Sequence, residues 1–289
     1  MAVSNYESPR TVEAAVEALY EANGRAKLLA GGTDLIIQMR ENNINPDTII
    51  DIKKIPEMTK IIKKDGEFYI GAAVTGAVLN ENKEVKLVWP GVVEALELIG
   101  STQIQGRATI GGNLCNGSPA ADSVPAMIAA DAVAVIRGKR GNREILVSDF
   151  LVGPGLSFLS PDEILVSIRL PRRRPRSADA YLRFIPRTEM DIAVVGVGVD
   201  LSLDKNGTCI AARVALGAVA EKAILVKDAA NAIVQTDLND KALTLLANAA
   251  RAACRPIDDK RGTKEFRREV AGVLACRAAK ISFERARIE

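Results

Sequence analysis

Residues 109–125 read TIGGNLCNGSPAADSVP, and this stretch decides how the 289-residue chain is interpreted. An apolar run enters the glycine pair Gly111-Gly112, and a small polar residue, Asn113, then precedes further apolar residues. The same order occurs earlier in the chain, where residues 31–35 read GGTDL. Glycine pairs let the backbone adopt positive φ and approach a ligand closely, so successive N–H groups can form an anion-binding nest. Two such turns are suited to the two phosphates of a dinucleotide.

Each glycine pair also has a plainer interpretation as an ordinary tight turn. Neither pair fits the G-x-G-x-x-G pattern of dinucleotide-binding Rossmann folds, and neither fits the G-x-x-x-x-G-K-S/T pattern of P-loops. Those two classes of nucleotide-binding protein are therefore not predicted.

The chain contains no histidine. Histidine is the usual general base of nucleophilic triads and the commonest transition-metal ligand, so its absence excludes a Ser-His-Asp hydrolase and a His-bearing zinc site. The four cysteines are far apart in sequence and form no C-x-x-C pair, whereas Fe–S clusters and structural zinc sites need clustered thiolates. We expect no metal site on this chain.

Charge and hydropathy exclude further classes of protein. The net charge is +3 and only 4% of residues are aromatic, so nucleic-acid binding is not predicted. No apolar run reaches the roughly 18 residues of a membrane span, and the first residues, MAVSNYESPR, do not resemble a signal peptide. We expect a cytoplasmic protein.

One basic stretch, residues 171–176, reads PRRRPR. Its two prolines keep it out of a helix, which fits a solvated loop between strands. The alternative is an electrostatic patch for an acidic partner or a nucleotide phosphate.

The apolar pattern predicts a two-lobed N-terminal domain over residues 1–176. Residues 12–19, 26–30, 35–40 and 48–52 predict helix, strand, helix and strand, which makes a small α/β lobe over about residues 1–55. The second lobe, about residues 56–176, is α+β; we expect a hairpin over 61–72, a helix over 92–99 and strands over 132–137, 144–147 and 164–170.

The remaining residues, 177–289, predict a C-terminal domain made of an antiparallel sheet and helices. Apolar runs at 180–184, 192–203 and 209–216 predict strands, and Asp204-Lys205-Asn206-Gly207 is a hairpin signal. Helices are expected over 223–234, 240–253 and 264–281.

Residues 109–125 resemble the FAD-binding, or medium, subunit of the molybdenum hydroxylases, a family that includes xanthine dehydrogenase and the carbon monoxide dehydrogenase medium chain. The first glycine turn, KLLAGGTDLI at residues 27–36, is similar to the family's other FAD loop. Further matches are GPG at 153–155, PDEIL at 161–165 and RTEMDIA at 187–193. The resemblance implies an α+β fold, with an FAD-binding domain of the vanillyl-alcohol oxidase (PCMH) type and a C-terminal domain of the carbon monoxide dehydrogenase flavoprotein type.

The resemblance also implies which residues contact FAD. The two loops would wrap the pyrophosphate and ribityl chain with backbone N–H groups and short side chains, and Ile192 would lie beside the isoalloxazine ring. The flavin itself carries the chemistry, so no catalytic side chain is implied. The cofactor-binding residues implied in this way are Leu28, Leu29, Ala30, Gly31, Gly32, Thr33, Asp34, Leu35, Thr109, Ile110, Gly111, Gly112, Asn113, Asn116, Ser118, Asp122, Leu165 and Arg183.

Several of these positions have plainer interpretations. Ser118 could begin a helix, Asp122 could cap one, and Leu165 and Ile192 could be ordinary buried strand residues. Cys115, inside the second loop, suggests redox chemistry, but a buried structural thiol is the expectation we prefer.

The resemblance implies an electron-transfer function in a complex. Electrons from a molybdenum cofactor on a large subunit would pass through [2Fe–2S] clusters on a small subunit to FAD, and then to NAD⁺, O₂ or another acceptor. The complex would be a dimer of heterotrimers. The chain lacks the cysteine-rich insertion of the 4-hydroxybenzoyl-CoA reductases, which disfavours that enzyme.

Two other classes of function stay open. A stand-alone FAD-dependent oxidoreductase would need its own substrate pocket with a base near the flavin. A non-enzymatic nucleotide-binding or interaction module would keep the apolar pattern but would not need Ser118 and Asp122, whose presence favours a working FAD site.

Overall fold

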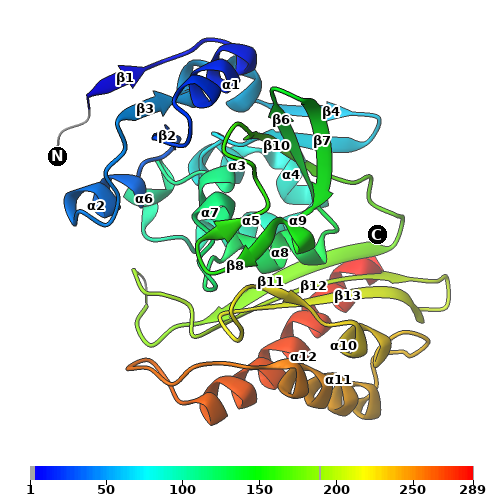
Figure 1. Cartoon of the computed structure of the whole chain (residues 1–289). Coiled ribbons are helices and arrows are strands. Elements are labelled where there is room, and N and C mark those ends of the chain that lie inside the picture. Colours follow the sequence, from blue (N-terminus) through cyan, green and yellow to red (C-terminus); the bar gives the residue numbers. More distant parts are fainter. Residues whose placement is uncertain (1–3, 189, 289) are drawn as a thin grey trace.

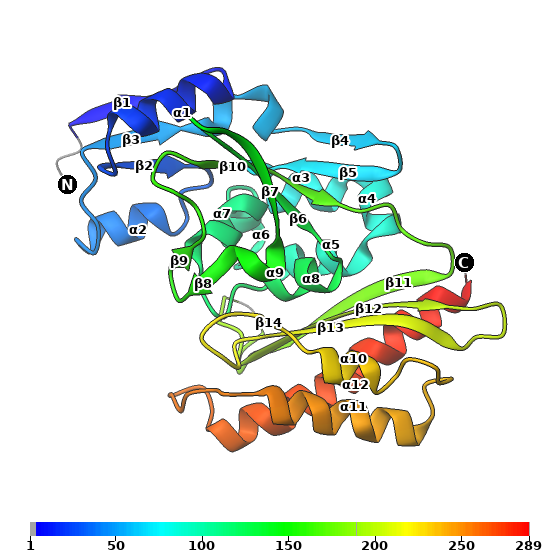
Figure 2. The ribbon, with the colours of Figure 1, turned by 45° about the vertical axis from the view of Figure 1, so that its right-hand side comes forward.

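The computed structural model describes residues 4–188 and 190–288. A four-stranded sheet crosses the middle of the molecule, with the N-terminal lobes on one side of it and the C-terminal helices on the other (Figures 1 and 2). Two clusters of buried apolar side chains lie on either side of this sheet, one mainly from residues 12–170 and one from residues 178–286.

The first lobe is a small parallel sheet with strand order β1-β3-β2. It contains β1 (Asn5–Glu7), α1 (Val12–Glu21), β2 (Ala26–Leu29), α2 (Leu35–Arg40) and β3 (Thr48–Asp51). The four predicted elements are confirmed, and β1, which pairs in parallel with β3, is additional. β2 leads directly into the first glycine pair.

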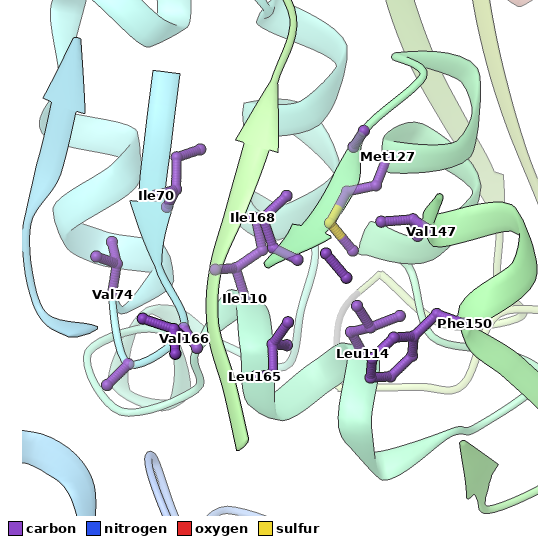
Figure 3. Packing of buried hydrophobic residues seen from close by; sticks show 14 of the residues in the cluster. Ile70, Val74, Ile110, Leu114, Met127, Val147, Phe150, Leu165, Val166 and Ile168 are labelled. Carbon is purple, nitrogen blue, oxygen red and sulfur yellow. The ribbon is translucent and has the colours of Figure 1, made fainter. Parts of the chain in front are cut away.

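The second lobe is built on a five-stranded antiparallel sheet with strand order β4-β5-β10-β6-β7. Its core packs the sheet against α7 and neighbouring helices, as Figure 3 shows for Ile110, Leu114, Phe150, Leu165 and Ile168. The strands are β4 (Ile61–Lys64), β5 (Glu67–Gly71), β6 (Val133–Gly138), β7 (Gly141–Leu146) and β10 (Ile164–Leu170), with a small separate pair β8 (Leu151–Gly153) and β9 (Leu156–Ser157).

Most helices of the second lobe lie in one continuous stretch of sequence between β5 and β6. They are α3 (Gly76–Glu81), α4 (Lys83–Val88), α5 (Pro90–Glu97), α6 (Thr102–Gln105), α7 (Ile110–Asn116) and α8 (Ser123–Ala129), while α9 (Val147–Phe150) follows β7. Helices α5 and α8 lie on the face of the central sheet that is turned toward the N-terminal lobes (Figure 1).

The central sheet is antiparallel, in the order β11-β12-β13-β14. Its strands are β11 (Ser177–Phe184), β12 (Val195–Leu203), β13 (Cys209–Gly217) and β14 (Ile224–Leu225). On its far face lie α10 (Lys227–Asn231) and α12 (Lys264–Ile288), and α11 (Asp240–Ala253) packs against these two helices. α11 begins and ends as predicted, and α12 is longer than predicted.

One predicted helix is wrong. Residues 223–234 do not form a single helix, because Ile224–Leu225 pair with β13 and only Lys227–Asn231 are helical. The N–H of Val226 donates to the carbonyl oxygen of Val214, which ties this segment to the sheet. A short apolar run fits a strand and a helix equally well. Here the edge of β13 offers unpaired backbone groups, so residues 224–225 form a strand beside it.

Glycines allow α8 to lie directly on the central sheet. A Cβ at Gly198 of β12 would lie 2.6 Å from the carbonyl oxygen of Pro125, and one at Gly217 of β13 would lie 2.6 Å from Cγ of the same proline. Arg213 of β13 donates from Nη2 to the carbonyl oxygen of Ile128 at 3.0 Å, near the C-terminal end of α8. Both ends of the helix are thus set against the sheet.

The basic stretch is neither a uniformly solvated loop nor a continuous patch. The Arg173 side chain is only 7% exposed, and its guanidinium pairs with Asp179 at 2.8 Å and Asp200 at 2.9 Å and lies 3.7 Å above the ring of Trp89. Arg172 and Arg174 are exposed. Arg173 is therefore part of the interior, where it neutralises the buried carboxylate of Asp179 and the partly buried one of Asp200.

We predict that Arg173→Ala lowers the free energy of unfolding by about 3–5 kcal/mol, because it leaves the buried Asp179 and the partly buried Asp200 without their cation. Burial already raises the pKa of Asp200 to about 7 and raises the pKa of Asp179, while Arg173 opposes both shifts. Without Arg173 both pKa values rise further, so the folded variant takes up protons at these carboxylates as the pH falls. The loss of unfolding free energy relative to the unmodified chain should therefore be smaller at pH 5.5 than at pH 8. Urea unfolding at both pH values measures this. Arg174→Ala is the control, with an expected change within about 0.5 kcal/mol; equal losses in the two variants would contradict the buried role.

Candidate functional site

The first glycine loop connects β2 to α2. Gly32 has φ +79°, a left-handed conformation that favours glycine. A Cβ on Gly31 would collide with the carbonyl oxygen of Arg107, which lies just before the second loop. The absence of a side chain at Gly31 therefore brings the two loops into direct backbone contact.

The second loop is the beginning of a helix. Thr109 is the N-cap of α7, and its Oγ1 accepts a hydrogen bond from the N–H of Gly112 at 3.0 Å. The expected turn with positive φ is wrong, because neither Gly111 nor Gly112 has it. Because these glycines have no side chain, Ala72 and the Thr109 hydroxyl can lie close to the backbone of α7. A Cβ on Gly111 would lie 2.5 Å from that of Ala72, and one on Gly112 would lie 2.7 Å from Oγ1 of Thr109.

The two loops differ in which N–H groups remain available. In the second loop, the N–H groups of Ile110, Gly111, Gly112 and Asn113 donate to Val74, Ala72 and Thr109. In the first loop, within the described part of the chain, no acceptor satisfies the N–H groups of residues 31–35. The N–H groups of the glycine pair are therefore unpaired in the first loop and paired in the second, which corrects the expectation of free N–H groups at both pairs.

Two polar side chains that were not predicted fix the loops: Gln38 joins the first loop's helix to α7, and Lys53 holds the first loop to its own lobe. Gln38 of α2 donates from Nε2 to Oδ1 of Asn116, in the last turn of α7, at 3.1 Å. Lys53 donates from Nζ to the carbonyl oxygen of Ala30 at 3.2 Å and pairs with Asp51 at 2.8 Å. No local pattern marks Gln38 or Lys53 in the sequence, because each acts on a residue that only the fold brings near.

Short polar side chains continue the site beyond α7. Oδ1 of Asn113 accepts from Oγ of Ser123 at 2.6 Å, which fixes the amide orientation, and Oγ of Ser118 accepts from the N–H of Ala120 at 3.2 Å. The side chains of Asn113, Asn116 and Ser118 are half-buried. They leave the Nδ2 groups of both asparagines and the hydroxyl proton of Ser118 available to a ligand.

Asp122 links this row of polar groups to the central sheet. Its carboxylate accepts from the hydroxyl of Tyr181 at 2.9 Å and from Nη1 of Arg183 at 2.8 Å, both on β11. Burial raises the pKa of Asp122 to about 6, against the opposing effects of Arg183 and Tyr181. The structure thus brings Asp122 and Arg183 together, and adds Tyr181, which sequence reasoning missed.

Two implied contact residues face the core instead of open space. Ile110 is fully buried and Leu165 is 3% exposed, and both point into the cluster of Figure 3. For Leu165 this agrees with the plainer interpretation as a buried strand residue. The leucines of the first loop are intermediate, since Leu28, Leu29 and Leu35 are half-buried.

Ile192 is 52% exposed and precedes β12, so its interpretation as a buried strand residue is wrong. The side chain of its neighbour Asp191 is only 6% exposed and accepts from the N–H of Ile192, from Arg261 and from Arg187. These contacts lower the pKa of Asp191 to about 2. They fix the backbone that presents Ile192. Glu189 of the same motif lies outside the described residues.

Cys115 is exposed, which corrects the expectation of a buried thiol.

Within residues 4–188 and 190–288, no group of three or more His, Cys, Asp or Glu side chains is arranged to hold a metal ion. Among the helices of those same ranges, none has the length and apolar character needed to cross a membrane.

Comparison with known families gives two matches in chain order. Residues 2–173 match the family described as the FAD binding domain in molybdopterin dehydrogenase. Residues 180–281 match the CO dehydrogenase flavoprotein C-terminal domain. The α+β fold with an FAD-binding domain followed by this C-terminal domain is therefore confirmed, as is FAD as the cofactor of the family.

Individual relatives agree over nearly the whole chain. The xanthine dehydrogenase FAD-binding subunit of Escherichia coli O157:H7 is 33% identical over 91% of this chain and 90% of its own length. The carbon monoxide dehydrogenase medium chain of Hydrogenophaga pseudoflava is 31% identical over 97% of both chains.

The same agreement extends to three dimensions. The carbon monoxide dehydrogenase from Hydrogenophaga pseudoflava that lacks the Mo-pyranopterin moiety contains a chain that superposes with a TM-score of 0.94 at 31% identity and covers 98% of both chains. The protein therefore belongs to the family of FAD-binding subunits of the carbon monoxide dehydrogenase and xanthine dehydrogenase oxidoreductases.

Proposed function

We propose that this chain is the FAD-binding electron-transfer subunit of a multi-subunit molybdenum hydroxylase. It takes electrons from [2Fe–2S] clusters on a partner subunit and passes them through FAD to NAD⁺, O₂ or another acceptor. The observation that carries the proposal is the contact between the two glycine loops, which leaves the five unpaired N–H groups of residues 31–35 beside the polar row of α7.

The donor set fits FAD. The unpaired N–H groups of the first loop suit the pyrophosphate, because an anion in a backbone nest satisfies several donors at once. The amides of Asn113 and Asn116, the hydroxyl of Ser118 and the carboxylate of Asp122 suit the hydroxyl groups of the ribityl chain and ribose. When bound, FAD supplies the capacity to accept and release electrons one or two at a time.

The other implied residues have supporting roles in this proposal. Gly31, Gly32, Gly111 and Gly112 permit the close backbone approach, and Ile110 and Leu165 support the loops from the core. Arg183 holds Asp122, and the exposed Ile192 is available to the ring. The proposed first-loop contacts are Leu28, Leu29, Ala30, Gly31, Gly32, Thr33, Asp34 and Leu35.

We also propose the assembly and the division of the chain. The partners are a small [2Fe–2S] subunit and a large molybdenum-cofactor subunit, in a dimer of heterotrimers in the cytoplasm. The name of the Hydrogenophaga pseudoflava relative, a medium chain, supports a multi-subunit complex. The two apolar clusters support a boundary near residue 176 between the FAD-binding domain, 1–176, and the C-terminal domain, 177–289.

The purified full chain is expected to bind FAD. Its visible spectrum after addition of FAD and removal of the excess should show flavin bands at roughly 370 and 450 nm. A correctly folded chain that stays colourless, alone and with its partner subunits, would instead support the interaction-module alternative.

We predict that Gly112→Val abolishes FAD binding. The valine Cβ would lie 2.7 Å from Oγ1 of Thr109 and would displace the hydroxyl that caps α7, so the second loop would move away from the first. The flavin-to-protein absorbance ratio measures the loss, and unfolding curves check that the C-terminal domain is intact. Gly106→Val is the control, because a Cβ there meets only the carbonyl oxygen of Gln103 at an ordinary 3.5 Å. Full flavin occupancy in Gly112→Val would exclude this role for the loop.

The affinity for FAD is expected to fall as the pH drops through about 6. The ionised carboxylate of Asp122 accepts hydrogen bonds from ligand hydroxyls on both oxygens and more strongly than the neutral acid, one of whose oxygens carries the proton, and burial places its pKa at about 6. Quenching of FAD fluorescence between pH 5 and 9 gives the dissociation constant at each pH. Asp122→Asn should bind FAD more weakly and with no transition near pH 6; a transition that persists in this variant would assign it to another group.

A further inference from the structure

Asp122 does not act as a helix cap, although it occupies the N-cap position of α8. Its side chain makes no capping hydrogen bond. The carboxylate turns instead to β11, where Tyr181 donates to Oδ1 and Arg183 to Oδ2. Aspartate at an N-cap normally stabilises its own helix through this bond, so the departure indicates that the carboxylate is held for another purpose.

Tyr181 and Arg183 reach Asp122 from the same face of β11. They are two residues apart in the strand, so their side chains point to the same side of the sheet. The Tyr181 residue is 2% exposed and the Arg183 side chain is 4% exposed. Each carboxylate oxygen therefore has one fixed donor from the C-terminal sheet and keeps further acceptor capacity for a ligand.

The neighbouring strand leaves room for the Tyr181 hydroxyl. Gly196 of β12 lies beside it, and a Cβ at Gly196 would collide with that hydroxyl. The backbone is thus open at the position where the oxygen must sit to reach Asp122. This local fit places the hydroxyl, and not only the ring, in a defined position.

The electrostatics at Asp122 involve few groups. The groups that act on its pKa are Arg183 and Tyr181 on β11, and both lower it against the effect of burial. α8, which follows Asp122, contributes no charged or titratable side chain in its sequence SVPAMIA. The glycines Gly198 and Gly217 of β12 and β13 face the same helix. The pKa of Tyr181 is raised well above its usual value by burial, so the phenol stays protonated and remains a donor.

We propose that Tyr181 is a positioning residue of the FAD site: its hydroxyl, together with Arg183, orients the Asp122 carboxylate and keeps it ionised for the cofactor hydroxyls. Through this contact the C-terminal sheet completes a site whose other groups come from the two N-terminal loops. The inference rests on the proposed function of Asp122 as an FAD contact.

The test is the pH dependence of FAD binding by full-length Tyr181→Phe. Loss of a hydrogen bond to a charged acceptor shifts a protonation equilibrium by roughly tenfold. The pKa of Asp122 should therefore rise in the variant, and FAD binding at pH 6.5 should weaken at least threefold relative to the unmodified chain, with a clearly smaller difference at pH 8.5, where only the loss of orientation remains. Fluorescence titrations at both pH values measure this.

Three further variants make the result specific. Tyr69→Phe removes a comparable hydroxyl, bonded to Glu67 at 3.0 Å in the other sheet, and should match the unmodified chain at both pH values. Tyr181→Phe added to Asp122→Asn should change nothing further, because the group through which it acts is gone. Arg183→Gln tests the other carboxylate oxygen and should weaken binding at pH 6.5 in the same direction; it also provides the test if Tyr181→Phe does not fold.

The possible outcomes separate this inference from the proposed function. If Tyr181→Phe binds FAD like the unmodified chain, or is equally weakened at pH 6.5 and 8.5, the positioning role is wrong while the FAD site stands. If the unmodified chain binds no FAD at any pH, the proposed function fails, and the inference fails with it. Weakening that is larger at pH 6.5 than at pH 8.5, and absent in the Asp122→Asn background, supports the inference.

Discussion

The contact between Gly31 and the backbone of Arg107 is the constraint on which the arrangement of the site depends. The two loops belong to different lobes, one built on a parallel sheet and one on an antiparallel sheet, so only the packing of the two lobes brings them together. Because Gly31 has no side chain, the first loop can rest on the segment that leads into α7. The Gln38–Asn116 hydrogen bond then fixes their relative position, so the free N–H groups of one loop lie beside the polar side chains of the other.

A second set of close contacts determines where the C-terminal sheet sits. Pro125 at the start of α8 lies on Gly198 and Gly217, and a larger residue at either glycine would push the helix away. Since Asp122 immediately precedes α8, the position of the helix also sets the position of the carboxylate. Packing of small residues thus determines the geometry of the polar contacts with β11. A shift of the sheet would therefore move the Asp122 carboxylate within the site.

The sequence was sufficient for the elements with strong periodicity and for the two loops, because glycine pairs between apolar runs are a local signal. It was insufficient where the structure of a segment depends on residues that are distant in the sequence. Residues 224–225 became a strand because β13 had an open edge, and Arg173 became a buried cation because Asp179 and Asp200 lie beside it. Tyr181, Gln38 and Lys53 belong to the site for the same reason. Gly111 and Gly112 were recognised, but as a turn, since a glycine pair does not distinguish a left-handed turn from a helix start that needs close approach.

Strand β11 carries both buried polar clusters of the domain contact, and they lie on one face. Asp179, Tyr181 and Arg183 alternate along the strand, so all three point toward the N-terminal domain. Asp179 accepts from the N–H of Val92 in the first turn of α5 and from Arg173, while Tyr181 and Arg183 bind Asp122 before α8. An apolar face would bury as much area but would allow α5 and α8 to slide. Directional hydrogen bonds permit one register, and burial makes each of them costly to break. The strand therefore orients both helices together, and the FAD site takes its final shape from a domain that contributes neither of its loops.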